Sequence, residues 1–238
     1  MTSIRVTDVL KPWRQPLEAP AFDLPGSEAL RRALNVTVAA AGLVAVTPLM
    51  VVIALAIKLT SRGPVFYTQM RVGMDRRAPG APAGNSRRRH DSGGRPFRIY
   101  KFRTMSTAQQ SATAEVWAQQ NDPRITAIGR ILRGYRLDEL PQLINVLLGD
   151  MNVVGPRPEQ PTIFVRLRDE IERYQERQRV RPGITGWAQI NQQYDSSVDD
   201  VRRKLQLDLE YISRVSATED LRIMLRTFPV MVGKQGSR

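Results

Sequence analysis

Two adjacent carboxylates, Asp138 and Glu139, begin the stretch of this chain whose residue types and spacing could best do chemistry. Apolar residues follow at the i, i+3, i+4, i+7, i+8 spacing of one buried helical face. Pro141 is tolerated in a first helical turn, and Gly149 stands where a helix stop belongs, so the pattern predicts a helix that starts at Asp138 or Glu139. The apolar positions are Leu140, Leu143, Ile144, Leu147 and Leu148.

The predicted position of this acidic pair has two interpretations. A helix N-terminus favours ionised carboxylates by about 0.3–1 kcal/mol per charge, so a carboxylate held there is a candidate nucleophile or metal ligand. Acidic residues are also common in first turns simply because they cap the helix, and for the pair alone capping is the more frequent role. The rest of the chain must decide between the two.

The composition restricts the available chemistry. The 238 residues contain no Cys, and the one His, His90, lies in a run of Arg, Gly and Ser. Disulfides, thiol catalysis and thiolate metal sites are therefore excluded, and the position of His90 argues against imidazole chemistry. A net charge of +13 and a pI near 10.9 indicate an anionic partner, such as nucleic acid, acidic lipid headgroups or a phosphorylated substrate.

Residues 33–57 form an uncharged apolar run that is long enough to cross a bilayer, which takes about 20 residues. Pro48 lies near its middle and would kink a helix there, and the hydroxyl of Thr47 is a candidate partner for the freed carbonyls. Lys and Arg prefer the cytoplasmic side, and here they flank both ends. The pattern leaves a re-entrant, broken helix and a kinked span equally open. The flanking residues are Arg31, Arg32, Lys58 and Arg62.

Several basic residues stand on stiffened backbone. Lys101 and Arg103 lie in an alternating segment typical of a strand, Arg157 lies between two prolines, and Arg181 precedes Pro-Gly. Arg binds phosphate oxygens in a bidentate manner, so these residues are candidate phosphate ligands. The carboxylate pair would repel such phosphates unless a divalent cation stood between them, and Mg²⁺ commonly binds through one or two carboxylates plus substrate phosphates. The residues alone therefore predict phosphoryl-group chemistry at a membrane surface.

The remaining elements are predicted from pattern. Residues 62–74 indicate a turn and a short strand, and residues 75–95 a flexible basic loop. Residues 161–178 have the dense charge of a surface helix. Further helices are expected at 128–135, at 198–215 with Val201, Leu205, Leu209 and Ile212 on one face, and at 219–232. The helix at 219–232 suits either core packing or the membrane interface.

Five segments, in this order, closely resemble the bacterial sugar transferase family, the monotopic polyprenyl-phosphate phosphoglycosyl transferases. The resemblance covers about residues 30–232. Larger members carry additional N-terminal membrane helices, and this chain resembles the small form. The segments are Lys101-Phe102-Arg103-Thr104-Met105, Asn121-Asp122-Pro123-Arg124-Ile125-Thr126, Leu137-Asp138-Glu139-Leu140-Pro141-Gln142-Leu143, Gly149-Asp150-Met151 with Gly155-Pro156-Arg157-Pro158, and Arg181-Pro182-Gly183-Ile184-Thr185-Gly186-Trp187-Ala188-Gln189.

The resemblance implies an α+β, mainly α fold. An N-terminal re-entrant (broken) membrane helix precedes a compact cytosolic catalytic domain, which has amphipathic interfacial helices and a small β element. The family's helix breaks at a Ser-Pro or similar step, which Thr47-Pro48 matches, so the re-entrant form is favoured. The expected divisions are a flexible tail at 1–28, the membrane helix at 29–60, the catalytic domain at 61–232 with a flexible basic insertion at 75–95, and a C-terminal tail at 233–238.

The resemblance also implies a reaction. A UDP-sugar would donate its sugar-1-phosphate to polyprenyl (undecaprenyl) phosphate, giving a polyprenyl diphosphate-sugar and UMP, as a first membrane step of polysaccharide or glycoconjugate biosynthesis. Asp138 would be the nucleophile that carries the phosphosugar, and Glu139 would hold Mg²⁺, with Mn²⁺ as the alternative ion. Arg133, Arg157 and Arg181 match family positions that contact phosphate or support the site.

The implied partners follow from that reaction: a UDP-sugar, polyprenyl phosphate, inner-membrane lipids and downstream glycosyltransferases, with no nucleic acid. The implied location is the bacterial inner (plasma) membrane, with the catalytic domain on its cytoplasmic face. A homodimer is among the assemblies that the sequence leaves open.

The chain departs from the family at two points. Arg136 stands where the family usually has Ser or Thr, two residues before the catalytic Asp, and Asn191-Gln192-Gln193 replaces Asn-Gly-Arg. Two other functions compete with the transferase hypothesis. A non-catalytic cationic membrane module that binds anionic lipid or nucleic acid would explain the charge but not the acidic pair, and a hydrolase would use water in place of the lipid acceptor.

Overall fold

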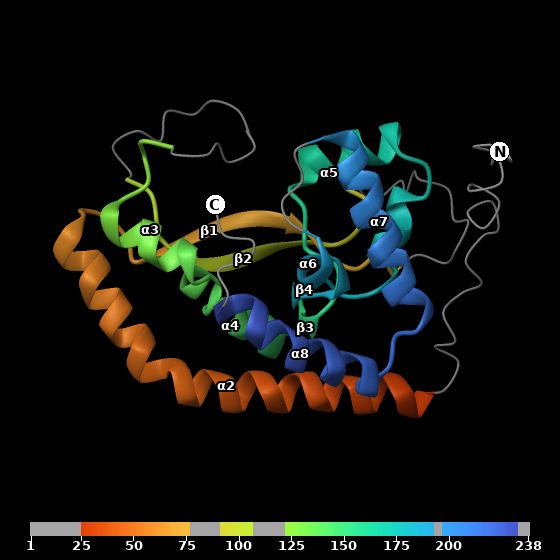
Figure 1. The fold of residues 1–238 in the computed structure, drawn as a ribbon, viewed down its shortest axis with the longest axis horizontal. Helices are drawn as coiled ribbons and strands as arrows, with labels where there is room; N and C mark the ends of the chain where they lie inside the picture. The colour runs from red at the N-terminus through yellow and green to blue at the C-terminus, as the bar shows by residue number, and fades with distance from the viewer. Residues whose placement is uncertain (1–24, 77–90, 107–121, 193–196, 233–238) are drawn as a thin grey trace, which may run out of the picture.

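The computed structural model describes residues 25–76, 91–106, 122–192 and 197–232 (Figure 1). Residues 1–24 of the predicted N-terminal tail, the C-terminal tail at 233–238 and residues 77–90 of the basic insertion, His90 included, lie outside the described residues. Residues 25–28, predicted as the end of that tail, are helical. The described part is mainly helical, as predicted, and has two small sheets where one small β element was expected. Its helices are α2 (Pro25–Thr60), α3 (Ala127–Gly134), α4 (Gln142–Leu148), α5 (Pro161–Glu170), α6 (Trp187–Asn191), α7 (Val198–Ser213) and α8 (Ala217–Val232), with 3₁₀ turns η3 (Leu137–Glu139) and η4 (Tyr174–Arg179).

The strands form two pairs. The predicted strands in 62–74 and 97–105 are β1 (Phe66–Val72) and β2 (Pro96–Phe102), which pair antiparallel. A second, parallel pair joins β3 (Asn152–Val154) to β4 (Gly183–Thr185), which the sequence pattern did not predict because each strand is only three residues long. The β3–β4 pair places the segment that follows Arg181 beside the segment that precedes Arg157. The backbones near these two arginines therefore lie close together.

Helix α2 is a single bent helix with Pro48 inside it, and it runs along the lower and left margins of the view (Figure 1). The Thr47 hydroxyl donates to the carbonyl of Leu43 at 2.6 Å, whereas the carbonyl that Pro48 leaves without its helical donor is that of Val44, so the predicted partner is one residue away from the freed carbonyl. Proline is the usual cause of a sharp helix bend. The stretch from Glu28 to Thr60 is long and apolar enough to cross a membrane, judged by length and composition.

The N-terminal part of α2 is fixed to the rest of the chain by a buried polar network. Arg31 Nε donates to Asp220 Oδ2 at 2.8 Å, and Arg31 Nη2 donates to the Tyr211 hydroxyl at 2.6 Å. Asn35 Nδ2 donates to the same Asp220 oxygen, and Asn35 Oδ1 accepts from the backbone N–H of Val153. Arg31, predicted as a flanking charge, therefore lies inside the protein and joins α2 to α7, α8 and β3.

The core has two main parts around α7 and α2. All four residues of the predicted α7 face, Val201, Leu205, Leu209 and Ile212, are buried against α5 and its neighbours, which confirms that face. The C-terminal part of α2 packs against β2 and α3.

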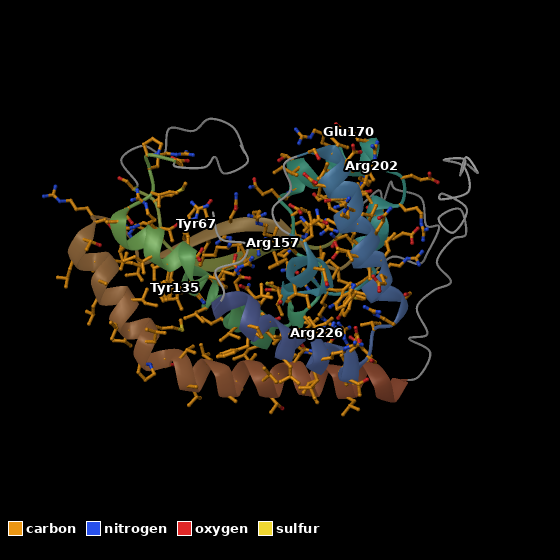
Figure 2. All side chains as sticks on the ribbon, viewed as in Figure 1. Tyr67, Tyr135, Arg157, Glu170, Arg202 and Arg226 are labelled. Atoms are coloured by element: carbon orange, nitrogen blue, oxygen red, sulfur yellow. The ribbon has the colours of Figure 1, made fainter. Side chains whose placement is uncertain are left out.

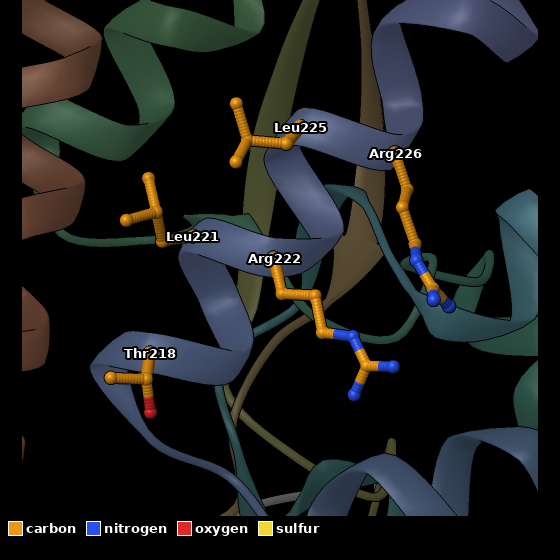
Figure 3. A pocket seen from close by; sticks show the side chains of 5 residues that line it. All are labelled: Thr218, Leu221, Arg222, Leu225 and Arg226. Carbon is orange, nitrogen blue, oxygen red and sulfur yellow. The ribbon is translucent and has the colours of Figure 1, made fainter.

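Helix α8 is amphipathic, as predicted, but its leucines do not pack into the core. Leu221, Leu225 and Phe228 are exposed, whereas Ile223 is fully buried. The side chains of Leu221 and Leu225 point to one side of the helix, and the guanidinium groups of Arg222 and Arg226 point to the other (Figure 3). Between the two predicted settings, this exposure favours an interfacial one.

We expect Asp220→Asn to destabilise the protein strongly, because it leaves the Arg31 guanidinium buried without its counter-ion. Breaking one partner of a buried pair costs about 3–5 kcal/mol. Thermal unfolding of the purified protein, followed by circular dichroism, measures the effect. Asp169→Asn, at a largely exposed aspartate on α5, is the matched control. Equal melting temperatures for the two variants would contradict the importance of the network.

Candidate active site

The acidic pair lies in the 3₁₀ turn η3, and α4 begins only at Gln142, with Pro141 as its N-cap. The predicted helix start at Asp138 or Glu139 is therefore wrong by one turn. Pro141 has no N–H to donate to the carbonyl of Leu137, and that carbonyl instead accepts from the N–H of Leu140 at 3.3 Å. The predicted stop is confirmed, since Gly149 ends α4 in the left-handed region with φ 86°.

The buried residues of α4 are Gln142, Asn145 and Val146, two of them polar. The predicted leucine face is confirmed only in part, because Leu140 and Leu143 pack against the core whereas Leu147 and Leu148 are 38% and 62% exposed. Asn145 is fully buried instead and bonds the edge of β2: its Nδ2 donates to the carbonyl of Arg98 at 2.7 Å and its Oδ1 accepts from the N–H of Tyr100 at 3.0 Å. A strand edge needs hydrogen-bond partners, which a leucine cannot supply. This contact holds the acidic turn at a fixed distance from Lys101 on the same strand.

Glu139 receives two cations from different parts of the chain. Lys101 Nζ lies 2.7 Å from Glu139 Oε1, and Arg157 Nη2 lies 2.7 Å from the same oxygen. Arg157 Nη1 lies 3.4 Å from Oε2. Asp138 and Glu139 are only 9% and 6% exposed. The structure thus brings together four of the predicted site residues, on η3, β2 and the loop after β3. Of these residues, Arg157 is labelled in Figure 2.

The two adjacent carboxylates are electrostatically different. Burial raises the pKa of Asp138 to about 6, although Lys101 opposes that rise. Burial also acts on Glu139, but the ion pairs with Arg157 and Lys101 outweigh it and hold the pKa of Glu139 well below its usual range. Glu139 is therefore ionised and neutralised by its partners, while Asp138 changes its charge close to neutral pH. Separated pKa values in a carboxylate pair are typical of sites that assign different roles to the two groups.

The other predicted phosphate ligands lie at different distances from this centre. Arg133 on α3 is close enough for its charge to favour the ionised form of Asp138. Arg103 is buried and donates to the Ser61 carbonyl at 2.9 Å and its hydroxyl at 2.7 Å, so it ties β2 to the end of α2. The described contacts of Arg103 do not include the acidic pair, which does not support its predicted role in phosphate binding.

Arg181 likewise lies away from the acidic pair. Its Nη1 pairs with Glu28 at 2.6 Å and its Nε donates to the carbonyl of Gly149 at 3.2 Å. Arg32 donates to the carbonyls of Val146 and Met151. The last carbonyls of a helix have no partner within it, and cations near them are favourable. Arg181 therefore caps the C-terminal end of α4, and its predicted role at the phosphates stays a prediction.

Two basic residues near the centre were not predicted as site residues. Arg71 on β1 donates to the carbonyl of Pro158. Burial, together with the nearby charge of Arg157, lowers the pKa of Arg71. Arg177 was predicted as a surface charge but is 1% exposed and bonds the carbonyl of Arg157. The strand pairing of β1 with β2 was a usable signal for Arg71, whereas nothing in the local charge pattern distinguishes Arg177 from its exposed neighbours.

The donor set permits a hard divalent cation only together with other ligands. Among the described residues, no group of three or more acidic or imidazole side chains gathers. Asp138 and Glu139 supply carboxylate oxygens, and Oε2 of Glu139 has only the 3.4 Å contact with Arg157, while Oε1 holds two cations. Such a set fits Mg²⁺ or Mn²⁺, which bind through one or two carboxylates and complete their shell with phosphate oxygens and water.

Comparison with known proteins identifies the family. Residues 26–234 match the family described as bacterial sugar transferase. The chain belongs to this family. Bacterial sugar transferases similar to it include a UDP-N-acetylgalactosamine-undecaprenyl-phosphate N-acetylgalactosaminephosphotransferase of Aeromonas hydrophila, 39% identical over 209 residues that cover 88% of this chain and 45% of that protein.

Two further relatives extend the comparison. An undecaprenyl-phosphate glucose phosphotransferase of Komagataeibacter xylinus is 42% identical over 202 residues, which are 83% of this chain and 35% of that protein. An exopolysaccharide production protein PSS of Rhizobium leguminosarum bv. phaseoli is 36% identical over 205 residues, which are 83% of this chain and 92% of that protein. The chain thus spans less than half the length of the first two relatives and nearly all of the third.

We expect Asp138→Asn to stabilise the fold at neutral pH. The ionised form of a carboxylate whose folded pKa is raised from 3.8 to about 6 opposes folding; this penalty is absent below the lower value and complete above the higher one. About two pKa units correspond to about 3 kcal/mol. Chemical denaturation at pH 7.5 and pH 4.5 measures the gain, which should shrink at the lower pH. Asp150→Asn is the control, and a gain that does not depend on pH would contradict the assignment.

Proposed function

We propose that this chain transfers sugar-1-phosphate from a UDP-sugar to a polyprenyl phosphate, giving a polyprenyl diphosphate-sugar and UMP. The observation that carries the proposal is the difference between two adjacent carboxylates. Glu139 is paired with Lys101 and Arg157, whereas burial raises the pKa of Asp138 to about 6. Relatives named for undecaprenyl-phosphate sugar phosphotransfer support the substrate classes. The relative named for exopolysaccharide production supports a role early in the synthesis of a surface polysaccharide.

The proposed reaction has two steps on one phosphorus atom. A carboxylate oxygen of ionised Asp138 attacks the sugar-side phosphorus of the UDP-sugar; a P–O bond to Asp138 forms, the pyrophosphate bond breaks, and UMP leaves with the electron pair. An oxygen of the polyprenyl phosphate then attacks the same phosphorus and releases the Asp138 carboxylate. Because the first product leaves before the second substrate reacts, we expect ping-pong kinetics.

The neighbouring residues bind and orient the phosphates in this scheme. Arg157 and Lys101 present guanidinium and ammonium donors at the site, and Arg133 adds positive charge beside Asp138. Glu139 would hold Mg²⁺, or Mn²⁺, which supplies charge neutralisation to the phosphate groups and the departing UMP. The low exposure of Asp138 limits the access of water, which favours transfer to the lipid over hydrolysis.

The membrane placement is part of the proposal. We place the protein on the cytoplasmic face of the inner membrane, with α2 entering and leaving by that face at the Pro48 bend. Its support is the bent apolar helix, whose residues Val44, Val52, Leu55 and Leu59 are exposed, together with the exposed leucines of α4 and α8. A polyprenyl acceptor would then reach Asp138 from the lipid side.

We expect the purified protein, incubated with Mg²⁺ and a panel of UDP-sugars that includes UDP-glucose and UDP-N-acetylgalactosamine, to gain a phosphosugar mass on Asp138. Intact-protein and peptide mass spectrometry detect the adduct, with the lipid acceptor omitted. Asp138→Asn should abolish it, whereas Asp150→Asn, near the end of α4, should retain it.

Two results would overturn the proposal. One is the absence of both an adduct and UMP release with every donor, even after polyprenyl phosphate is added, which would favour the cationic binding module. The other is UMP release that proceeds at the same rate without a lipid acceptor, which would favour a hydrolase.

We expect the rate of adduct formation to fall about tenfold per pH unit below about pH 6, because attack requires ionised Asp138. Lys101→Met should move this limb to higher pH, since the Lys101 charge lowers the pKa of Asp138. Quenched-flow measurements from pH 5 to pH 8.5 test both statements. Lys58→Met, an exposed residue near the end of α2, is the control. A limb that is identical in wild type and Lys101→Met would contradict the assignment.

A further inference from the structure

The loop that carries Arg157 is held by its carbonyl groups. Pro156 and Pro158 lack an N–H group, so the loop cannot use these positions as donors to anchor itself. Four consecutive carbonyls are instead bonded by donors from three other elements, β1, η4 and β4. The bonds are Gly183 N–H to Pro156 at 2.9 Å, Arg177 Nη2 to Arg157 at 3.1 Å, Arg71 Nη1 to Pro158 at 3.2 Å and Val72 N–H to Glu159 at 2.9 Å.

Among these donors, Arg177 is the one that bonds the carbonyl of Arg157 itself. It lies on η4 and is 1% exposed. Its Nε donates to Asp208 Oδ2 at 2.7 Å, its Nη1 donates to the Tyr174 hydroxyl at 2.6 Å, and its guanidinium carbon lies 5.0 Å from the centre of the Tyr174 ring. All three nitrogens of the guanidinium group therefore have a partner, and the fork has a fixed orientation.

A contribution to stability does not by itself account for this buried pair. Removing both charges from a buried ion pair in favour of apolar residues is often neutral or stabilising, so such a pair is weak evidence for a stabilising role. The planar guanidinium group differs from other side chains in that it can bond a carboxylate, a hydroxyl and a carbonyl in one fixed geometry. In this chain the carbonyl that Arg177 bonds belongs to Arg157, whose side chain contacts Glu139.

We propose that Arg177, oriented by Asp208 and Tyr174, is a positioning residue that sets the place of Arg157 against Glu139. The inference rests on the proposed transferase function and adds to it a residue that contacts neither substrate nor the reacting atoms. Arg177 bonds the backbone carbonyl of Arg157 and also lies 3.7 Å from Glu159 Oε1 in the same loop. The bond from Arg157 to Glu139 at 2.7 Å is the contact that it maintains.

The proposal predicts a consequence for the substrate. If Arg157 moves away from Glu139, the site loses a correctly placed guanidinium donor for the phosphate groups. The loss should therefore appear in kcat/KM for the UDP-sugar and not only in the stability of the fold.

The test compares Arg177→Lys with Arg31→Lys, since both arginines are buried and paired with a buried carboxylate but only Arg177 contacts the Arg157 loop. The lysine keeps the charge and loses the fork. We expect Arg177→Lys to lower kcat/KM for the UDP-sugar about 10- to 100-fold, as small misplacements in a site do. Arg31→Lys should lower the melting temperature without a comparable loss of kcat/KM.

A double-mutant cycle separates positioning from general weakening of the fold. On an Arg157→Lys background, Arg177→Lys should cost less than about threefold, because the group that it positions is already altered. Tyr174→Phe removes one bond to Arg177 and serves as the milder variant if Arg177→Lys does not fold. It should lower kcat/KM as well, by a smaller factor.

The outcomes distinguish this inference from the proposed function. If the wild-type protein forms no adduct, the transferase proposal fails. If the wild-type protein forms the adduct but the effects of Arg177→Lys and Arg157→Lys on kcat/KM multiply, or Arg177→Lys and Tyr174→Phe leave kcat/KM unchanged, then Arg177 has only a structural role and the positioning inference is overturned.

Discussion

The shared carboxylate of Glu139 is the contact on which the arrangement of the site depends. Its Oε1 accepts from Lys101 and from Arg157, which arrive from β2 and from the loop after β3. No single element could supply both cations, so the hairpin, the 3₁₀ turn and the parallel strand pair must all be in place before the charges balance. A buried carboxylate with one cation missing would be costly, and this links correct folding of three separate segments to the formation of the site.

That balance also explains how adjacent residues of the same chemical type acquire different properties. Asp138 and Glu139 are both buried, but Glu139 receives the close cations and Asp138 receives mainly the penalty of burial. Asp138 and Glu139 are adjacent in the turn, and the different positions of Lys101 and Arg157 relative to them explain the low pKa of Glu139 and the raised pKa of Asp138. A site that must hold one charge permanently and use another transiently gains both from a single pair in this way.

The sequence predicted the parts of the structure that depend on local pattern. The face of α7, the stop at Gly149 and the strands around Lys101 followed from periodicity and glycine chemistry. The start of α4 and the exposure of its last turn did not, because a helical pattern of leucines cannot distinguish a buried position from an apolar position on the surface. Leu140 and Leu143 pack against the core, but Leu147 and Leu148 lie on the surface. Arg177 was missed for a related reason, since one charge in a charged segment is buried only by tertiary contacts that local sequence does not contain.

The placement of the two arginines at the start of α2 connects the long apolar helix to this centre. Arg31 and Arg32 were predicted as charges that flank a membrane segment, yet both side chains enter the protein, one to Asp220 and the other to the last carbonyls of α4. Helix α4 in turn carries Asn145, which holds β2 and with it Lys101. Lys101 in turn pairs with Glu139. A displacement of α2 at Arg32 would therefore reach Glu139 through α4 and β2, so the orientation of the apolar helix and the geometry of the acidic pair are set together.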